Sequence, residues 1–144
     1  MSLEARPLLV IEADVEAPAD LGARRMIAIT GGRVSGAVSG VVLPGADWQS
    51  VRADGALEIS AHYAIRTDDG ALIEVKSDGV RSGPPEVLAA LGRGEAVDAS
   101  RYYFRTAMRF HTAAAQHARL NGLLAVAKGE RRASVVRLEV FEIL

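Results

Sequence analysis

The sequence contains no cysteine and few aromatic residues. Its 144 residues include one tryptophan, three tyrosines and three phenylalanines, so that aromatic residues make up only 5% of the chain. The absence of cysteine excludes disulfide bonds, thiolate catalysis and zinc sites with cysteine ligands. Charge of one sign is not in excess either, because 17 lysines and arginines oppose 18 aspartates and glutamates. A nucleic-acid-binding protein needs a basic face that displaces counterions from phosphates, so we expect no nucleic-acid partner.

Long apolar segments are also missing. The longest uncharged run, residues 34–46, contains three glycines and Pro44 and cannot form a membrane helix of about 20 residues. The apolar stretch at residues 7–11 is too short for a signal peptide, and Glu4 lies where such peptides have positive charge. We therefore expect a cytoplasmic protein with no membrane partner. The hydrophobic content of 49% and the charged content of 24% are typical of a single soluble domain, here residues 1–144.

What the sequence does contain is a series of short alternating segments separated by turns. The clearest is residues 57–66, in which Leu57, Ile59, Ala61, Tyr63 and Ile65 share one face. It is followed by Asp69-Gly70, a dipeptide typical of tight hairpin turns. The patterns predict strands at residues 8–15, 26–30, 38–43, 47–52, 57–66, 71–76, 101–111, 123–128 and 134–144. Only two segments look helical, one from Pro84-Pro85 to Gly92 and one near residues 113–120.

Eight or nine strands with two short helices predict an all-β fold with an antiparallel sheet. Such a sheet must hide its edges, and closure into a barrel is the simplest way to do so. The interior of a barrel of about eight strands is either filled by side chains or holds one small ligand. A two-sheet sandwich is the alternative, and alternation by itself does not separate the two folds.

Metal binding and nucleophilic catalysis find little support. His111 and His117 are six residues apart with no acidic residue within four positions, and His62 stands alone on a strand. A zinc or iron site needs converging ligands, so we expect no metal and no cofactor. There is no GxSxG motif for a nucleophilic serine. The glycine-rich segment 31–36 follows a strand but precedes no helical pattern, which indicates a tight strand connection rather than a phosphate-binding loop.

The segment 101–111 concentrates aromatic and cationic side chains. One of its faces is apolar, and the other contains Tyr103, Arg105, Arg109 and His111. If the apolar face packs against the core, this is an ordinary surface strand. If the barrel is hollow and the second face lines its lumen, the row suits an anionic or phenolic ligand. Trp48, the single tryptophan, follows a turn, where it either lines the mouth of a cavity or fills the core.

Four blocks of sequence together resemble a known family. They are GGRVSGAVSGVVLPGADWQSVRADG, RTDDGALIEVKSDGVR, PPEVLAALGRGEAVDASRYYFR and LNGLLAVAKGERR. The combination, from about Leu8 to Leu144, resembles the proteins grouped as domain-of-unknown-function family 3237 (DUF3237), also called UPF0311. The resemblance implies a calycin-like β-barrel without an established general activity.

Some positions match the pattern of this family and others depart from it. The matching residues are Trp48, Tyr103, Arg105, Phe110 and Asn121. The departures include Ser60 and His62 where the family usually has aspartate and arginine, His111 within the Phe110-His111-Thr112 block, and His117 and Arg119 before Leu120-Asn121. We interpret the altered positions as clustering on the lumen face, so that this member holds a different ligand from its relatives.

The leading hypothesis is a β-barrel that binds a small, partly apolar, anionic or phenolic molecule in its interior. The expected contacts are Trp48, Tyr103 and Phe110 for surface area, and His62, Arg105, His111 and Asn121 for polar groups. An alternative is a cofactor-independent isomerase, cyclase or lyase that acts on an oxygenated small molecule, with His62 or His111 as the general base. A third hypothesis is an interaction protein that uses an exposed strand edge. Homodimer formation is left open by the sequence.

Overall fold

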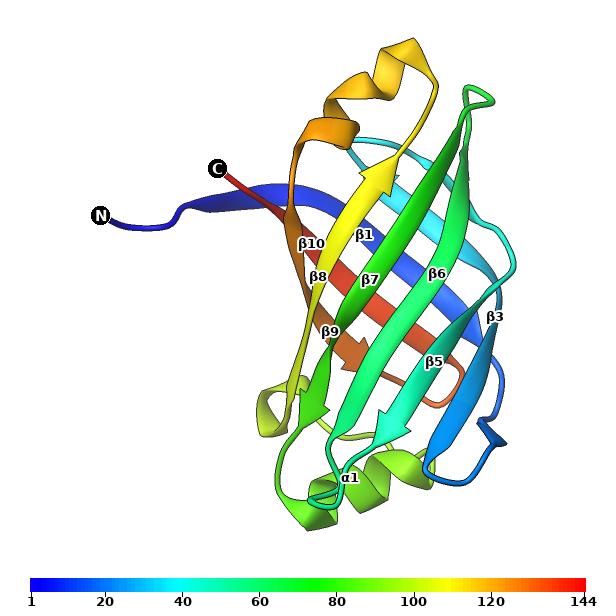
Figure 1. The fold of residues 1–144 in the computed structure, drawn as a ribbon, viewed down its shortest axis with the longest axis vertical. Coiled ribbons are helices and arrows are strands. Elements are labelled where there is room, and N and C mark those ends of the chain that lie inside the picture. The colour runs from blue at the N-terminus through cyan, green and yellow to red at the C-terminus, as the bar shows by residue number, and fades with distance from the viewer.

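Ten strands form one antiparallel sheet that curls until its first strand meets its third (Figure 1). The computed structural model describes residues 1–144. The strands are β1 (Ala5–Val15), β2 (Ala19–Asp20), β3 (Arg24–Gly36), β4 (Gly40–Val42), β5 (Gly45–Val51), β6 (Leu57–Thr67), β7 (Leu72–Ser82), β8 (Tyr103–His111), β9 (Ala125–Arg131) and β10 (Val135–Ile143). The helical segments are the α-helix α1 (Pro85–Gly92) and the 3₁₀-helices η1 (Ala99–Arg101) and η2 (Ala115–Gly122). None of these segments has the length and hydropathy that a membrane-crossing helix requires.

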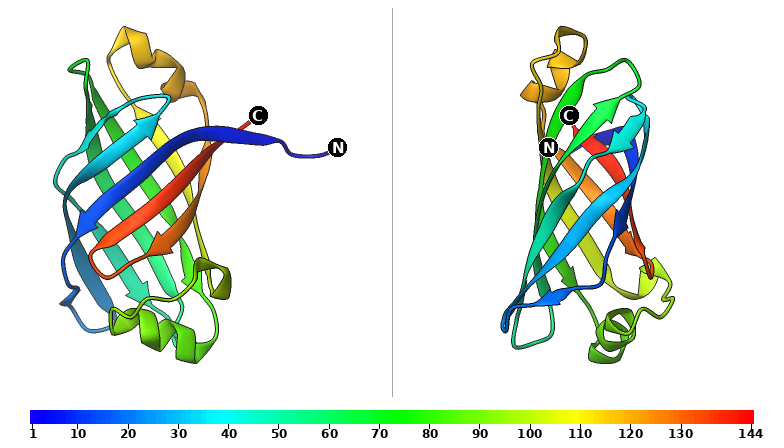
Figure 2. Two further views of the ribbon diagram at one scale, coloured as in Figure 1. Left: turned by 180° about the vertical axis from the view of Figure 1, so that it is seen from behind. Right: turned by 90° about the vertical axis from the view of Figure 1, so that its right-hand side faces the viewer.

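The sheet is closed, which confirms the barrel and excludes the sandwich. Strand β1 pairs with β10 on one side and with β3 on the other. The short strands β4 and β5 share one position between β3 and β6, so the barrel has eight strand positions. Figure 2 shows the strands winding around the barrel at a steep tilt. Each long strand pairs on both sides and only the two-residue strand β2 has a free edge, so the hypothesis of an interaction protein that uses an exposed strand edge has little structural basis.

Several strands run past the ends that the sequence pattern predicts, and in β3, β7 and β9 the extension passes through glycine. The segment 31–36 was expected to be a strand connection, but it lies within β3 and pairs with β1. At Gly32, which has a φ of +141°, an added Cβ would lie 2.1 Å from the carbonyl oxygen of Glu12. Strand β7 likewise continues past Lys76 to Ser82 through Gly79. Glycines inside these strands allow neighbouring backbones to approach closely where the sheet bends.

The apolar core runs through the barrel, from Ile65 and Phe110 near η2 to Leu57 and Phe104 near α1. The face of β6 predicted to be apolar points inward, and Ile65 on this face is fully buried together with Ile73 and Met108 from the next two strands. The two ends of the barrel are covered by helical segments. Leu120 of η2 is buried at one end, and Val87 and Leu91 of α1 are buried at the other (Figure 2).

A cluster of charges fastens the upper end. The carboxylate of Glu142 on β10 accepts hydrogen bonds from Arg6 Nε of β1 at 2.5 Å and from Arg119 of η2 at 2.7 and 3.0 Å. The hydrogen bonds from Arg119 and then from Arg6 lower the pKa of Glu142 to about 2. Because Glu142 is only 4% exposed, this carboxylate ties the N-terminal strand, the C-terminal strand and the 3₁₀ cover to one another.

Gly79 offers a test of the close strand contact. A Cβ at this position would lie 2.0 Å from the carbonyl oxygen of Arg105 on β8. Gly79→Ala is therefore expected to lower the free energy of unfolding by about 2–3 kcal/mol, because two paired backbones must separate. Gly92→Ala is the matched control, since its Cβ would meet nothing within 4 Å. Urea denaturation measures both variants, and equal stabilities would show that β7 and β8 tolerate the extra carbon.

Candidate functional site

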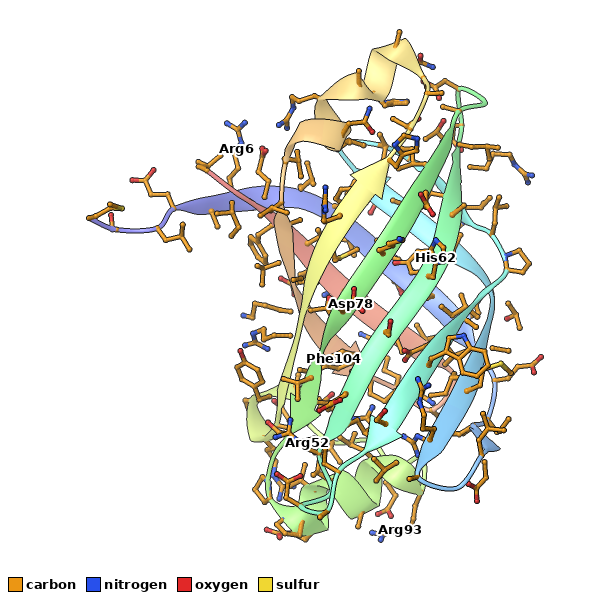
Figure 3. The ribbon with its side chains drawn as sticks, in the orientation of Figure 1. Arg6, Arg52, His62, Asp78, Arg93 and Phe104 are labelled. Atoms are coloured by element: carbon orange, nitrogen blue, oxygen red, sulfur yellow. The ribbon has the colours of Figure 1, made fainter.

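Most residues expected to line the lumen lie on the outside of the barrel, and for them the predicted placement is wrong. The exposed fraction of Tyr103 is 52%, and Arg105 and His111 share its outward face of β8. His62 lies on the outer side of β6, where Figure 3 labels it, and its register partner on β7 is Lys76. The reason is hydrophobic: the apolar face of β8, which includes Phe104 and Met108, takes the interior, so the cationic face turns to solvent.

The outward residues contact one another rather than a shared interior ligand. His62 Nε2 lies 2.6 Å from Glu74 Oε2, and the guanidinium of Arg105 lies 5.1 Å from the centre of the Tyr103 ring. His111 borders a shallow outer groove with Glu74 and Asn121. Two departures from the family pattern, at Ser60 and His62, also face outward, so our interpretation of a cluster on the lumen face is wrong for them.

The remaining predicted site residues have other surroundings. Trp48 is 42% exposed, because its neighbours Asp47 and Gln49 take the inward positions of β5. Phe110 does point inward, but it belongs to the apolar core. The Asn121 side chain accepts a hydrogen bond from the backbone nitrogen of Thr112 at 2.7 Å and donates one to its carbonyl oxygen at 2.9 Å. These two bonds hold η2 against the end of β8.

A cavity lies in the lower half of the lumen, and residues of the apolar core such as Ile59, Phe104 and Leu138 form part of its wall. Its empty volume is about 570 Å³ when the open mouth is counted, and the centres of water molecules reach about 50 Å³ of it, so the cavity is narrow. Ten of its 16 lining residues are hydrophobic. The polar lining comes from five neighbouring strands: Asp47 and Gln49 of β5, Tyr63 of β6, Ser77 and Arg81 of β7, Thr106 of β8 and Arg131 of β9.

Hydrogen bonds fix the orientation of the acidic side. Arg25 Nε donates to Gln49 Oε1 at 2.8 Å, and Gln49 Nε2 donates to Asp47 Oδ2 at 2.7 Å. Both ends of the Gln49 amide are thereby used. Asp47 Oδ1, in contrast, is buried and has no hydrogen-bond partner.

The opposite side of the cavity contains a second group of polar atoms. Ser77 Oγ donates to Thr106 Oγ1 at 2.8 Å. The guanidinium of Arg81 lies 6.0 Å from the centre of the Phe104 ring, and its Nε is buried without a partner. The hydroxyl of Tyr63 is buried and unpartnered as well. Buried polar atoms are nearly always hydrogen-bonded in native proteins, and each exception calls for an explanation.

Burial changes the protonation equilibria of these groups. It raises the pKa of Asp47 to about 6, even though the hydrogen bond from Gln49, the backbone of Ser60 and the charges of Arg81 and Arg25 act in the opposite direction. Burial also raises the pKa of Tyr63, with the charge of Asp47 adding to the effect. The pKa of Arg81 falls to about 10, first through burial and then through repulsion by Arg25 and Arg131. The lumen therefore contains a carboxyl group that gains and loses a proton near neutral pH.

The sequence held only weak signals for this site. Asp47 and Gln49 flank the exposed Trp48. The sequence alone does not say which face of β5 points inward, and the pairing of β5 with β6 is what places Asp47 and Gln49 in the lumen. Arg81 lies beyond Gly79, where the predicted strand had already ended. In a narrow barrel an inward arginine or aspartate breaks the apolar alternation, and that break is the signal that sequence reasoning can use.

Comparison with known proteins places the chain in a family. A family model described as "Protein of unknown function (DUF3237)" matches residues 3–143. The chain belongs to the DUF3237 family. A UPF0311 protein from Rhodopseudomonas palustris is 41% identical over 99% of this chain and 98% of its own length, and its crystal structure superimposes with a TM-score of 0.98. The resemblance stated from the sequence blocks is thereby confirmed.

Other solved structures extend the likeness of this DUF3237 protein. A "beta-barrel like protein" from Acinetobacter baumannii is 35% identical, with a TM-score of 0.86 over 100% of this chain and 98% of that one. An enzyme from Penicillium herquei is 21% identical with a TM-score of 0.70 over 100% of this chain and 96% of the other, a likeness of fold alone.

The raised pKa of Asp47 makes a testable statement about the stability of the DUF3237 protein. The Asp47 carboxyl group binds its proton more tightly in the folded state than in the unfolded state. Protonation of Asp47 therefore adds to the free energy of unfolding below about pH 4, and this contribution is lost as the pH rises through 6. Asp47→Asn removes the buried charge and keeps an oxygen for Gln49. We expect it to raise the free energy of unfolding at pH 7.5 by about 1–3 kcal/mol, and to have a much smaller effect at pH 4.

Chemical denaturation at the two pH values measures this difference. Asp78→Asn, on the outer side of β7, is the control for loss of one negative charge. A loss of stability at pH 7.5 on Asp47→Asn would mean that the arginines stabilise the carboxylate more than burial destabilises it.

Proposed function

We propose that the protein binds a small, partly apolar molecule with oxygen-containing groups in the lower half of its barrel. The observation that supports this function is the location of the buried unpartnered atoms. Asp47 Oδ1, Tyr63 Oη and Arg81 Nε are the buried side-chain atoms that lack a hydrogen-bond partner, and all three residues line one cavity. A ligand that accepts hydrogen bonds from Arg81 and Tyr63 and forms one with Asp47 removes the free-energy cost of burying these three atoms without partners.

The walls of the cavity suit the rest of such a molecule. Ile59 and Phe104 are among the hydrophobic side chains that surround the polar groups. Ligand pockets commonly combine an apolar lining with a few convergent polar groups, because the first gives affinity and the second fixes orientation. Since the space is narrow, a single ring or a short chain is the size that fits with small adjustments of the lining side chains.

Nuclear magnetic resonance with a library of ring-sized oxygenated compounds tests this proposal. We expect the compounds that bind to shift the backbone amide signals of lumen residues. Ala61→Leu places a larger side chain in the cavity. We expect it to weaken binding at least about tenfold, because this side chain occupies the space that the ligand needs. Ala107→Leu adds the same atoms on the outer face of β8 and leaves binding unchanged.

Binding at the outer groove rather than in the lumen would give a different set of shifted signals. If the compounds shift only residues around the outer groove that contains Arg109 and His111, the residues predicted from the sequence form the binding surface and the lumen does not.

A second candidate function is proton transfer on the bound molecule, and the geometry of Asp47 favours it. Gln49 occupies Oδ2, which leaves Oδ1 as the oxygen that gives or takes a proton in the lumen. A pKa of about 6 suits a general base or acid near neutral pH. Arg81 lines the same cavity and would stabilise negative charge that develops on a substrate oxygen. This assignment replaces His62 and His111, whose side chains lie outside the barrel.

Deuterium exchange on a bound carbonyl compound distinguishes catalysis from binding. We expect the wild type to exchange the proton next to the carbonyl group faster than Asp47→Asn by about a hundredfold or more, with a rate that rises with pH through about 6. The variant should still bind the compound, as measured by the lumen shifts. Equal exchange rates in the two proteins would leave the binding function and end the catalytic one.

A further inference from the structure

The lumen contains more positive than negative charge. Asp47 is the only carboxylate that lines the cavity, whereas Arg81 and Arg131 line it directly and Arg25 reaches it through Gln49. The three guanidinium groups and the carboxylate are close enough to influence one another electrostatically. Two positive charges are therefore left over when Asp47 is ionised.

None of the three arginines takes part in an ion pair, and Arg81 is the most deeply buried of them. Nε of Arg25 donates to Gln49, and Arg131 donates to the carbonyl oxygen of Arg132 at 2.6 Å. Arg81 is only 4% exposed, and it takes part in none of the ion pairs of the protein. A buried charge without a counter-ion is costly, and folded proteins normally pair it.

The surroundings of Arg81 select among anions. A guanidinium offers two parallel N–H groups, which match the two oxygens of a carboxylate. Phe104 lies beside this guanidinium and presents an apolar ring surface to the cavity. Thr106 accepts a hydrogen bond from Ser77, so its own hydroxyl proton is available to a further oxygen in the same cavity. A planar anion attached to a hydrophobic body uses all of these features.

We propose that the ligand is a ring-sized monocarboxylate whose carboxylate binds Arg81 and whose apolar part packs against Phe104 and the neighbouring hydrophobic wall. This inference rests on the proposed function and names the chemical class of its ligand. It also decides between the anionic and phenolic ligands that the sequence leaves open, because the missing component of the lumen is a negative charge rather than another neutral hydroxyl.

A pair of probes of equal shape tests the inference on the wild-type protein. Benzoate carries the charge, and benzamide has the same ring and outline without it. Titration followed by nuclear magnetic resonance reports the backbone amides of the lumen and the Nε–H signal of Arg81, assigned by its loss in Arg81→Lys. We expect benzoate to bind at least about tenfold more tightly than benzamide and to shift the Arg81 signal, since hydrogen bonds between charged groups are the stronger ones.

Two variants locate the effect. Arg81→Met should reduce benzoate binding to the level of benzamide. Arg105→Met removes the same charge from the outer face of the adjacent strand and should leave the preference for benzoate intact. Removal of an unpaired buried charge is not expected to unfold the barrel, and the comparison of the two probes on the wild type does not depend on either variant.

The outcomes separate this inference from the proposed function. Equal affinity for benzoate and benzamide, with lumen shifts for both, overturns the anion class and leaves a lumen that binds neutral molecules. Preference for benzoate that survives Arg81→Met and disappears in Arg105→Met overturns the placement of the anion. If neither probe moves any lumen signal, the ligand class and the proposed lumen site both fail.

Discussion

Strand β1 pairs with β10 along one side and with β3 along the other, and this double pairing forces every second residue into an enclosed space. In an open sheet the inward and outward faces would differ only in how much water they meet. Here the inward face has no route to water except through the ends of the barrel. An inward charged residue must therefore find a partner inside, whereas an outward one needs none. Closure turns the direction of a side chain into the main determinant of its chemistry.

The two halves of the lumen meet this constraint in opposite ways. Toward η2 the lumen is filled with residues such as Ile65, Ile73 and Met108, which are fully buried and contain no charge, and the buried carboxylate of Glu142 is paired with Arg6 and Arg119. The lower half keeps a carboxyl group and a guanidinium with unpartnered atoms. Proteins tolerate such costs at functional sites, where the rest of the fold supplies the stability. The closely packed half supports the barrel, and the half with unsatisfied polar groups has the properties of a binding site.

How much the sequence could predict follows from the same geometry. Alternation in segments such as Leu57–Thr67 depends only on neighbouring residues, so strands and a closed antiparallel sheet were within reach, and both are confirmed. The binding site could not be predicted, because alternation separates the two faces of a strand without saying which face points into the barrel. The cationic face of β8 looked functional for its composition, although hydrophobicity had already assigned the other face to the interior. Arg81 was missed because Gly79 lies before it and glycine normally weakens a strand. Here Gly79 instead allows the close approach of β7 and β8, so the strand continues.

The same geometry bears on how relatives of this family are to be compared. Identity of 35–41% with structures that superimpose closely shows that the barrel is shared, but outward residues such as Trp48 say little about what the lumen holds. The informative positions are the few inward polar ones, because each of them costs stability unless something in the lumen satisfies it. A relative that pairs Asp47 and Arg81 directly, or replaces both by hydrophobic residues, has the same fold without the same need for a ligand. Function in this family is therefore to be sought in departures from apolar alternation rather than in its surface residues.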